Sequence, residues 1–289
     1  MFIGTGLPCL DSRVHAQDEN PPQLPFEIAG IYKTADVPEI SGISFLKKTH
    51  GTTGDTAYCL VVSDKIESLF LIRIPLKEAR PSAEITIGAT LLRKIPDGVD
   101  LEGVAITADR TGAWLCGENY SITNSKVHYV PFDASLPVRS YSVKEVFNTQ
   151  GNGAEALALV LVGTKTELWV GHERFIPASA TPPIFRYSLP ANGAPVLLGK
   201  VTLTMPFHRS QSDLCFDPLR KRVWVLSREL RCLFAFAPGD ALGGSVKPDQ
   251  NSFNFTQWEH QLNIQTAYGM AEGVCFDPDG LLYLCFDNN

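Results

Sequence analysis

The chain has 289 residues, of which 44% are hydrophobic and 19% are charged, as in an ordinary globular protein. Its formal net charge of −6 excludes a general binder of nucleic acids or of anionic membranes, because phosphate surfaces repel a negative protein. No stretch approaches the roughly 20 apolar residues of a membrane-spanning helix, so we expect no integral membrane segment. All-β barrels and propellers of this length often form one domain.

Residues 1–25 are predicted to be a leader and linker ahead of one folded domain, residues 26–289. The first 16 residues end in Val14-His15-Ala16, which fits signal-peptidase cleavage, but they lack a basic start and their apolar run is short. They are either a signal peptide without its beginning or a disordered leader. A signal peptide predicts a periplasmic or extracellular protein, and a leader without that function predicts a cytoplasmic one.

A two-strand signature then recurs five times. Each copy has a short apolar strand that opens with a small or acidic residue, a polar turn, and a second apolar strand that ends in a charged residue. The copies are 39–45 with 57–64, 101–106 with 113–118, 154–160 with 168–173, 212–216 with 223–229, and 271–276 with 282–287. One aromatic residue marks each second strand, at successive separations of 56, 55, 55 and 59 residues: Tyr58, Trp114, Trp169, Trp224 and Tyr283.

This repeat predicts an all-β fold, a single β-propeller of about five four-stranded blades, with six blades as the alternative. A third and a more variable fourth strand follow the first four copies. Residues 26–33 form a strand without a blade of its own, and we expect this N-terminal strand to close the last blade and hide its edge. The fifth copy stops after its second strand, so either the C-terminus is truncated or the last blade has three strands.

Ten repeat positions should gather at one mouth of the central channel. In an antiparallel hairpin the start of the first strand and the end of the second lie at the same end of the sheet, and the first strands line the propeller axis. The positions are Ser41 with Asp64, Glu102 with Glu118, Glu155 with Glu173, Ser212 with Arg228, and Glu272 with Asp287. Crowded carboxylates repel each other unless a cation balances them.

We therefore predict a Ca²⁺ site at this mouth, because hard divalent ions prefer oxygen ligands. Glu102, Glu155 and Glu272 should project nearest the axis, with Asp64 and Asp287 as further ligands. The alternative is that these acids accept hydrogen bonds from backbone N–H groups of the next blade, which would be a purely structural role.

Basic side chains share the mouth and could bind an anionic substrate such as a phosphate ester. Arg174 and Arg228 are the candidate substrate-binding residues, and Glu118, Glu173 or His172 is the candidate catalytic base. The alternative is that the basic groups pair with the neighbouring acids. The chain has no GxSxG elbow, HExxH motif or P-loop, so those enzyme classes have no support.

Four segments resemble phytase-like propellers, the family named for the "esterase-like activity of phytase", and the related SdiA-regulated family. They are DLEGVAITADRTGAWLCGEN (100–119), AEALALVLVGTKTELWVGHER (154–174), QSDLCFDPLRKRVWVLSRE (211–229) and AEGVCFDPDGLLYLCFDN (271–288). The resemblance implies an exported bacterial propeller that depends on metal and acts on phosphate or other esters. The chain departs from the family at Ala156, where the family has Gly, and at Arg228, which replaces a common acid.

Two functional hypotheses follow. The first is a monomeric Ca²⁺-dependent hydrolase of a small anionic or ester substrate at the channel mouth. The second is a non-catalytic propeller that binds a ligand or a protein, or acts as a scaffold, and whose acidic ring is structural. The seven cysteines form no CxxC motif and six of them lie in apolar strands, so we expect buried thiols rather than a disulfide framework.

Overall fold

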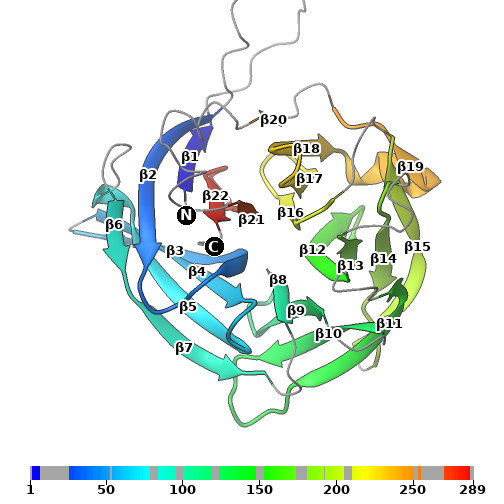
Figure 1. Cartoon of the computed structure of the whole chain (residues 1–289), viewed down its shortest axis with the longest axis horizontal. Helices are drawn as coiled ribbons and strands as arrows, with labels where there is room; N and C mark the ends of the chain where they lie inside the picture. Colours follow the sequence, from blue (N-terminus) through cyan, green and yellow to red (C-terminus); the bar gives the residue numbers. More distant parts are fainter. Residues whose placement is uncertain are drawn as a thin grey trace, which may run out of the picture.

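Five sheets surround a central axis, as predicted for a β-propeller (Figure 1). The computed structural model describes residues 2–6, 26–52, 54–78, 84–95, 100–118, 124–147, 153–173, 181–191, 193–204, 210–249, 253–254 and 270–286. Each sheet is one blade, and its innermost strand is the first strand of one repeat copy, namely β3, β8, β12, β16 or β21.

The blades follow the repeat in chain order. Blade 1 contains β3 (Ile40–Gly51), β4 (Gly54–Ser63), β5 (Ser68–Pro75) and β7 (Ala89–Lys94). Blade 2 contains β8 (Asp100–Ile106), β9 (Gly112–Glu118), β10 (Asn124–Pro131) and β11 (Arg139–Phe147). Blade 3 contains β12 (Ala154–Val162), β13 (Lys165–His172), β14 (Ile184–Ser188), β15 (Val196–Leu203) and the short β19 (Ser245–Val246).

The last two blades complete the ring. Blade 4 contains β16 (Asp213–Asp217), β17 (Arg222–Ser227), β18 (Cys232–Phe236) and β20 (Phe253–Asn254). Blade 5 contains β21 (Ala271–Phe276), β22 (Leu282–Phe286), β1 (Phe2–Gly6), β2 (Phe26–Thr34) and β6 (Glu84–Ile87). The short 3₁₀-helices η1 (Leu76–Glu78) and η2 (Pro238–Gly243) are the helical elements of the described chain.

Blade 5 joins the two ends of the chain. The prediction that the N-terminal strand closes the last blade is confirmed by β2, but β2 does not pair with β22 directly. The strand β1 lies between them, antiparallel to both, with Phe2 opposite Leu284 and Ile31 (Figure 1). The third strand of this blade thus comes from residues 2–6, within the predicted leader. The rest of that leader, residues 7–25, lies outside the described residues, so export stays a prediction.

The repeat aromatics of blades 3, 4 and 5 contact an aromatic ring of the next blade, whereas Tyr58 contacts Lys47 and Arg73 of its own blade. Trp169 is fully buried and stacks on Phe236 of blade 4, with ring centroids 6.2 Å apart. The ring centroid of Trp224 in blade 4 lies 5.3 Å from that of Phe276 in blade 5, with the two ring planes tilted by 38°. Both faces of each inner hairpin are therefore apolar, because each face meets another blade. The regular spacing of the aromatic residues reflects this repeated contact.

The inner strands of neighbouring blades approach each other backbone to backbone. A Cβ atom at Gly42 would lie 2.6 Å from the carbonyl oxygen of Glu102 in blade 2. A Cβ atom at Gly273 would lie 3.0 Å from the backbone nitrogen of Ile43 in blade 1. These glycines leave the room that a close approach of two backbones requires.

The described cysteines agree with the prediction of buried thiols. Six cysteines are free thiols, and five of them are buried. Within the described ranges, no helix has the length and the apolar character needed to cross a bilayer.

We predict that Gly42→Ala destabilises the protein by about 1–3 kcal/mol, because the added methyl group overpacks the contact between blades 1 and 2. Gly88→Ala is the matched control, since its Cβ atom would meet only the Asp36 carboxylate at 3.7 Å. Urea denaturation measures both. Equal free energies of unfolding for the two variants would contradict the close approach at the axis.

Candidate functional site

The repeat positions that open the five first strands lie at one mouth of the channel, and four of the five occupy β-bulges. The pairing of the first two strands skips one residue in four of the five blades, namely Ser41, Glu102, Glu155 and Glu272. A bulge turns its side chain away from the regular alternation of a strand and is frequent beside functional sites. Blade 4 has no such bulge, and its Ser212 N–H donates to the carbonyl of Leu226.

Arg228 joins three blades at this mouth. Its Nη2 atom lies 2.5 Å from Oε1 of Glu173 in blade 3, and its Nη1 atom lies 2.8 Å from Oε1 of Glu272 in blade 5. The two carboxylate side chains are only 4% and 10% exposed, and the arginine side chain is 23% exposed. Hydrogen bonds between charged groups in such partly buried positions are stronger than those between neutral groups.

The charges around Arg228 hold it in its cationic form. Burial lowers the pKa of Arg228, but the nearby charges of Glu272, Glu155 and Glu173 outweigh burial and raise it. Glu155 thus belongs to the same cluster, and its side chain is 6% exposed. The arginine that interrupts the acidic pattern in the sequence is the group that balances the acids of blades 3 and 5.

A second cluster lies at the boundary of blades 1 and 2. Lys65 Nζ lies 2.7 Å from Glu39 and 2.8 Å from Asp64, and these bonds raise the pKa of the lysine. Burial raises the pKa of Asp64, and the charges of Glu39 and Asp100 add to the effect, whereas Lys65 opposes it. Asp100 begins β8 opposite the backbone of Glu118.

Asp213 is a buried acid that sequence analysis did not single out. It is 1% exposed, and its Oδ2 atom accepts a hydrogen bond of 2.7 Å from the N–H of Val274 in blade 5. The N–H of Leu157 in blade 3 also donates to the carboxylate. Asp213 therefore bonds to both neighbouring inner strands. Asp213 pairs with Leu226 of β17. When the five inner strands are aligned by this pairing, the equivalent positions in the other blades hold small residues, namely Gly42, Gly103, Ala156 and Gly273.

The predicted site residues fall into two groups. Glu155, Glu173, Glu272 and Arg228 come together at one cluster, while Asp64 belongs to the Lys65 cluster. Glu102 occupies its bulge between them, and the described residues contain no group of three acids, histidines or cysteines with metal-binding geometry. The side chains of Glu118, Arg174 and Asp287 lie outside the described residues.

His172 is buried with a relative exposure of 2%, and its backbone N–H donates to the carbonyl of Pro183. The neighbouring Glu173 donates its backbone N–H to Gly153 and accepts from the N–H of Gln211. The roles of His172 and Glu173 in hydrolysis stay predictions, as do the anion-binding role of Arg228 and the metal-binding role of the acids.

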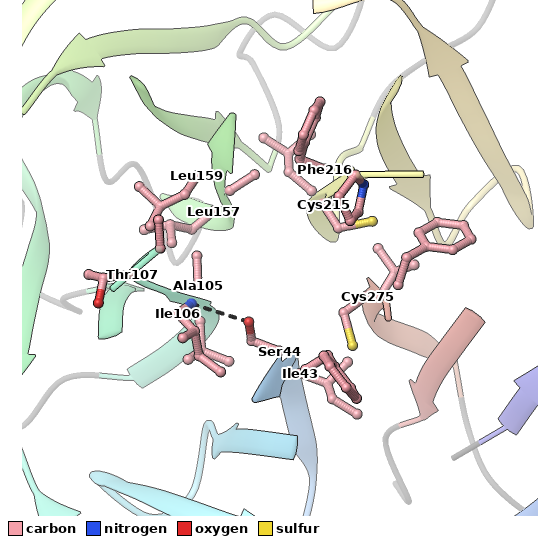
Figure 2. A pocket seen from close by; sticks show the side chains of 18 of the residues that line it. Ile43, Ser44, Ala105, Ile106, Thr107, Leu157, Leu159, Cys215, Phe216 and Cys275 are labelled. Carbon is pink, nitrogen blue, oxygen red and sulfur yellow. Dashed lines mark hydrogen bonds between the residues drawn. The ribbon is translucent and has the colours of Figure 1, made fainter. Parts of the chain in front are cut away.

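The other mouth of the channel holds an apolar pocket of about 350 Å³, shown in Figure 2. It lies at the opposite ends of the inner strands, where all five blades contribute side chains. Sequence analysis did not predict this pocket. The sequence feature that could have indicated the pocket is a stretch of three apolar or small residues at the same place in each first strand: 43–45, 104–106, 157–159, 214–216 and 274–276.

Three solved proteins that resemble the chain share little sequence with it. No protein-family model and no curated protein matches it. A Bacteroides thetaiotaomicron protein of unknown function is 12% identical, with a TM-score of 0.47, over 86% of this chain and 53% of that one. Kuenenia stuttgartiensis hydrazine synthase is 13% identical, with a TM-score of 0.45, over 85% and 68% of the two chains.

Myxococcus xanthus glutaminyl cyclase is 12% identical, with a TM-score of 0.43, and the match covers 89% of this chain and 94% of that one. The chain spans only 53% of the length of the Bacteroides protein. The β-propeller fold is therefore assigned from the sheets of this chain itself. Membership of the phytase-like or SdiA-regulated family stays a proposal.

We predict that Arg228→Met destabilises the protein by about 3 kcal/mol, because it leaves Glu173 and Glu272 buried without their cation. Arg222→Met is the matched control. Its ion pair with Asp249 is more exposed, so we expect a change of about 1 kcal/mol or less. Urea denaturation measures the free energy of unfolding of both variants. Equal losses of this free energy in Arg228→Met and Arg222→Met would contradict the bridging role of Arg228.

Asp213 gives a prediction about pH. Burial raises the pKa of Asp213 well above its ordinary value of 3.8, although the amides of Val274, Leu214 and Leu157 oppose the shift. The folded protein thus retains this proton to higher pH than the unfolded chain does. Its contribution to stability is fully present below the unfolded pKa and is lost as the pH rises toward the native one.

Asp213→Asn cannot titrate at this position. The stability of the wild type relative to this variant should therefore be greatest below the ordinary pKa of 3.8 and decline as the pH rises above it. Thermal unfolding of both proteins across these pH values measures the difference. A difference that grows with pH would show instead that the amide donors favour the ionised carboxylate.

Proposed function

We infer that this propeller acts by binding, without catalysis, and that its acidic ring is structural. The observation that carries the inference is the placement of Arg228 between Glu173 and Glu272. A guanidinium that is held by two carboxylates has little capacity left for an anionic substrate. The same two carboxylates are occupied by the arginine and are poorly placed to bind a metal ion.

The contacts of Asp213 support the same inference. Its carboxylate accepts backbone N–H groups from both neighbouring blades, which is the structural alternative that the sequence left open for such acids. Lys65 likewise neutralises part of the charge of Glu39 and Asp64. Asp213, Glu173 and Glu272 thus hold adjacent blades together through amide or charged partners, whereas the printed ion pairs of Lys65 lie within blade 1.

Ca²⁺-dependent hydrolysis of phosphate or other esters is the second candidate function. The observation that favours it is an excess of negative charge, because the described acids of this mouth outnumber the bases Lys65 and Arg228. These acids are Glu39, Asp64, Asp100, Glu102, Glu155, Glu173 and Glu272. The resemblance of four segments to phytase-like propellers supports this candidate and, with it, export from the cytoplasm.

Under the second candidate, Glu102, Glu155 and Glu272 would contribute the oxygen ligands of the ion, with Asp64 and Asp287 as further ligands. A bound Ca²⁺ ion would polarise the ester. Arg174 would contact the anionic group of the substrate, and Glu118, Glu173 or His172 would accept a proton from the attacking water.

Metal binding separates the two candidates. We predict that the protein after dialysis against EDTA retains its melting temperature, and that added Ca²⁺ changes neither this temperature nor the turnover of p-nitrophenyl phosphate and p-nitrophenyl acetate. A functional site at 100 times its Kd would instead add about 2.7 kcal/mol. For a chain of this size that stabilisation corresponds to roughly 5–10 °C.

One Ca²⁺ ion per chain, together with such a thermal shift and ester turnover, would contradict the binding function and support the hydrolase. In that case Glu102→Gln should lose the ion. Arg222→Gln should keep the ion, because Arg222 lies at the opposite end of β17 from Arg228 and pairs with Asp249.

A further inference from the structure

The apolar pocket has a repeated construction. Each of the five inner strands contributes a triplet of residues, and the central residue of the triplet is small in every blade. These central residues are Ser44, Ala105, Ala158, Cys215 and Cys275. Figure 2 shows Ser44, Ala105, Cys215 and Cys275 around the opening. Because small residues recur at equivalent places in all five blades, the sequence maintains the space rather than filling it.

The walls of the pocket suit an apolar group of limited size. Large apolar side chains follow the small ones in every blade, namely Phe45, Ile106, Leu159, Phe216 and Phe276. The volume of about 350 Å³ is at the lower end of the range of roughly 300–1,000 Å³ that small-molecule sites occupy. A strongly polar molecule would lose hydrogen bonds to water on entering these walls.

The rim of the pocket carries a positive charge. Among the described residues that line the pocket, Arg110 alone is charged. It occupies the exposed turn between β8 and β9 at a φ of 57°, and its guanidinium has no carboxylate partner within the described part of the chain. It is therefore available to an anion.

The acids of the neighbouring turns have partners of their own. Asp217 pairs with Arg220 at 2.7 Å, and Asp277 pairs with Lys48 at 3.2 Å. Asp109 accepts a hydrogen bond of 2.6 Å from the Thr107 hydroxyl and stabilises its own turn.

We propose that this pocket binds a small amphipathic anion, with its apolar body between the five inner strands and its anionic group at Arg110. The site adds a ligand class to the binding function proposed above and rests on that function. It lies at the opposite mouth from the acidic ring, so the two sites are tested separately. A carboxylate or sulfonate on an alkyl or aryl body has the required chemistry.

The probe is 8-anilinonaphthalene-1-sulfonate, which combines aromatic rings with one sulfonate and fluoresces when its rings leave water. We expect saturable binding of one molecule per chain and displacement by octanoate at lower concentration than by 1-octanol. Arg110→Gln should weaken the binding of the probe about tenfold, or ~1.4 kcal/mol, and should remove the preference for octanoate. Lys221→Gln is the matched control, because Lys221 occupies the equivalent turn of blade 4 at a φ of 53° but does not line the pocket.

A second variant tests the apolar space itself. Ser44→Leu should fill the pocket and abolish binding of the probe, provided that its circular dichroism and melting show a folded protein. Nuclear Overhauser effects from the probe to the methyl groups of Ile43 and Leu159 locate it without any substitution. Absence of these effects, or equal losses of affinity in Arg110→Gln and Lys221→Gln, would overturn the proposed site.

The outcomes also separate this site from the proposed function. Failure of the probe to bind, together with a protein that binds no Ca²⁺, would remove the pocket and leave the structural role of the acidic ring intact. Binding of the probe by a protein that also binds Ca²⁺ and hydrolyses esters would overturn the non-catalytic function and leave the pocket in place.

Discussion

The inner strands of the five blades meet at the propeller axis, and beside Gly42 and Gly273 the neighbouring backbones leave no room for a larger side chain. At Gly42 and Gly273 a single added carbon would reach the backbone of the next blade, so these positions allow the ring to close with five blades. The close approach has two consequences for function. It brings the starts of the inner strands together at one mouth, where the acids lie, and it brings their ends together at the other, where the apolar pocket lies.

Electrostatic contacts at the acidic mouth reinforce this closure. Asp213 occupies the inner-strand position that holds Gly or Ala in the other four blades, and its carboxylate accepts hydrogen bonds from N–H groups of blades 3 and 5. Arg228 spans the same two blades through Glu173 and Glu272. Both residues belong to blade 4, the blade without a bulge at the start of its inner strand. The side chains of Asp213 and Arg228 thus link blade 4 to both of its neighbours.

The sequence predicts the fold well because the contact between blades repeats. Trp114, Trp169 and Trp224 recur at nearly constant spacing since each packs against the next blade. Strand β1 was not predicted because Phe2–Gly6 is short, lies far from β2 in the sequence, and resembles a leader. The acidic mouth was predicted from strand ends alone. Its partners were not, because the Arg228 bridge connects three blades and depends on how each bulge directs its side chain. The pocket is visible in the sequence only when the five inner strands are aligned residue by residue.

Hydrogen exchange at the inner strands tests the closure of the ring most directly. If the five strands support each other at the axis, the amide protons of Ile43, Leu157 and Val274 will exchange only when the whole protein unfolds. Their opening free energies will then equal the global free energy of unfolding from denaturation. Exchange of any one of these amides at a much lower free energy would show that its blade opens independently, and would contradict the central role of the close approach at the axis.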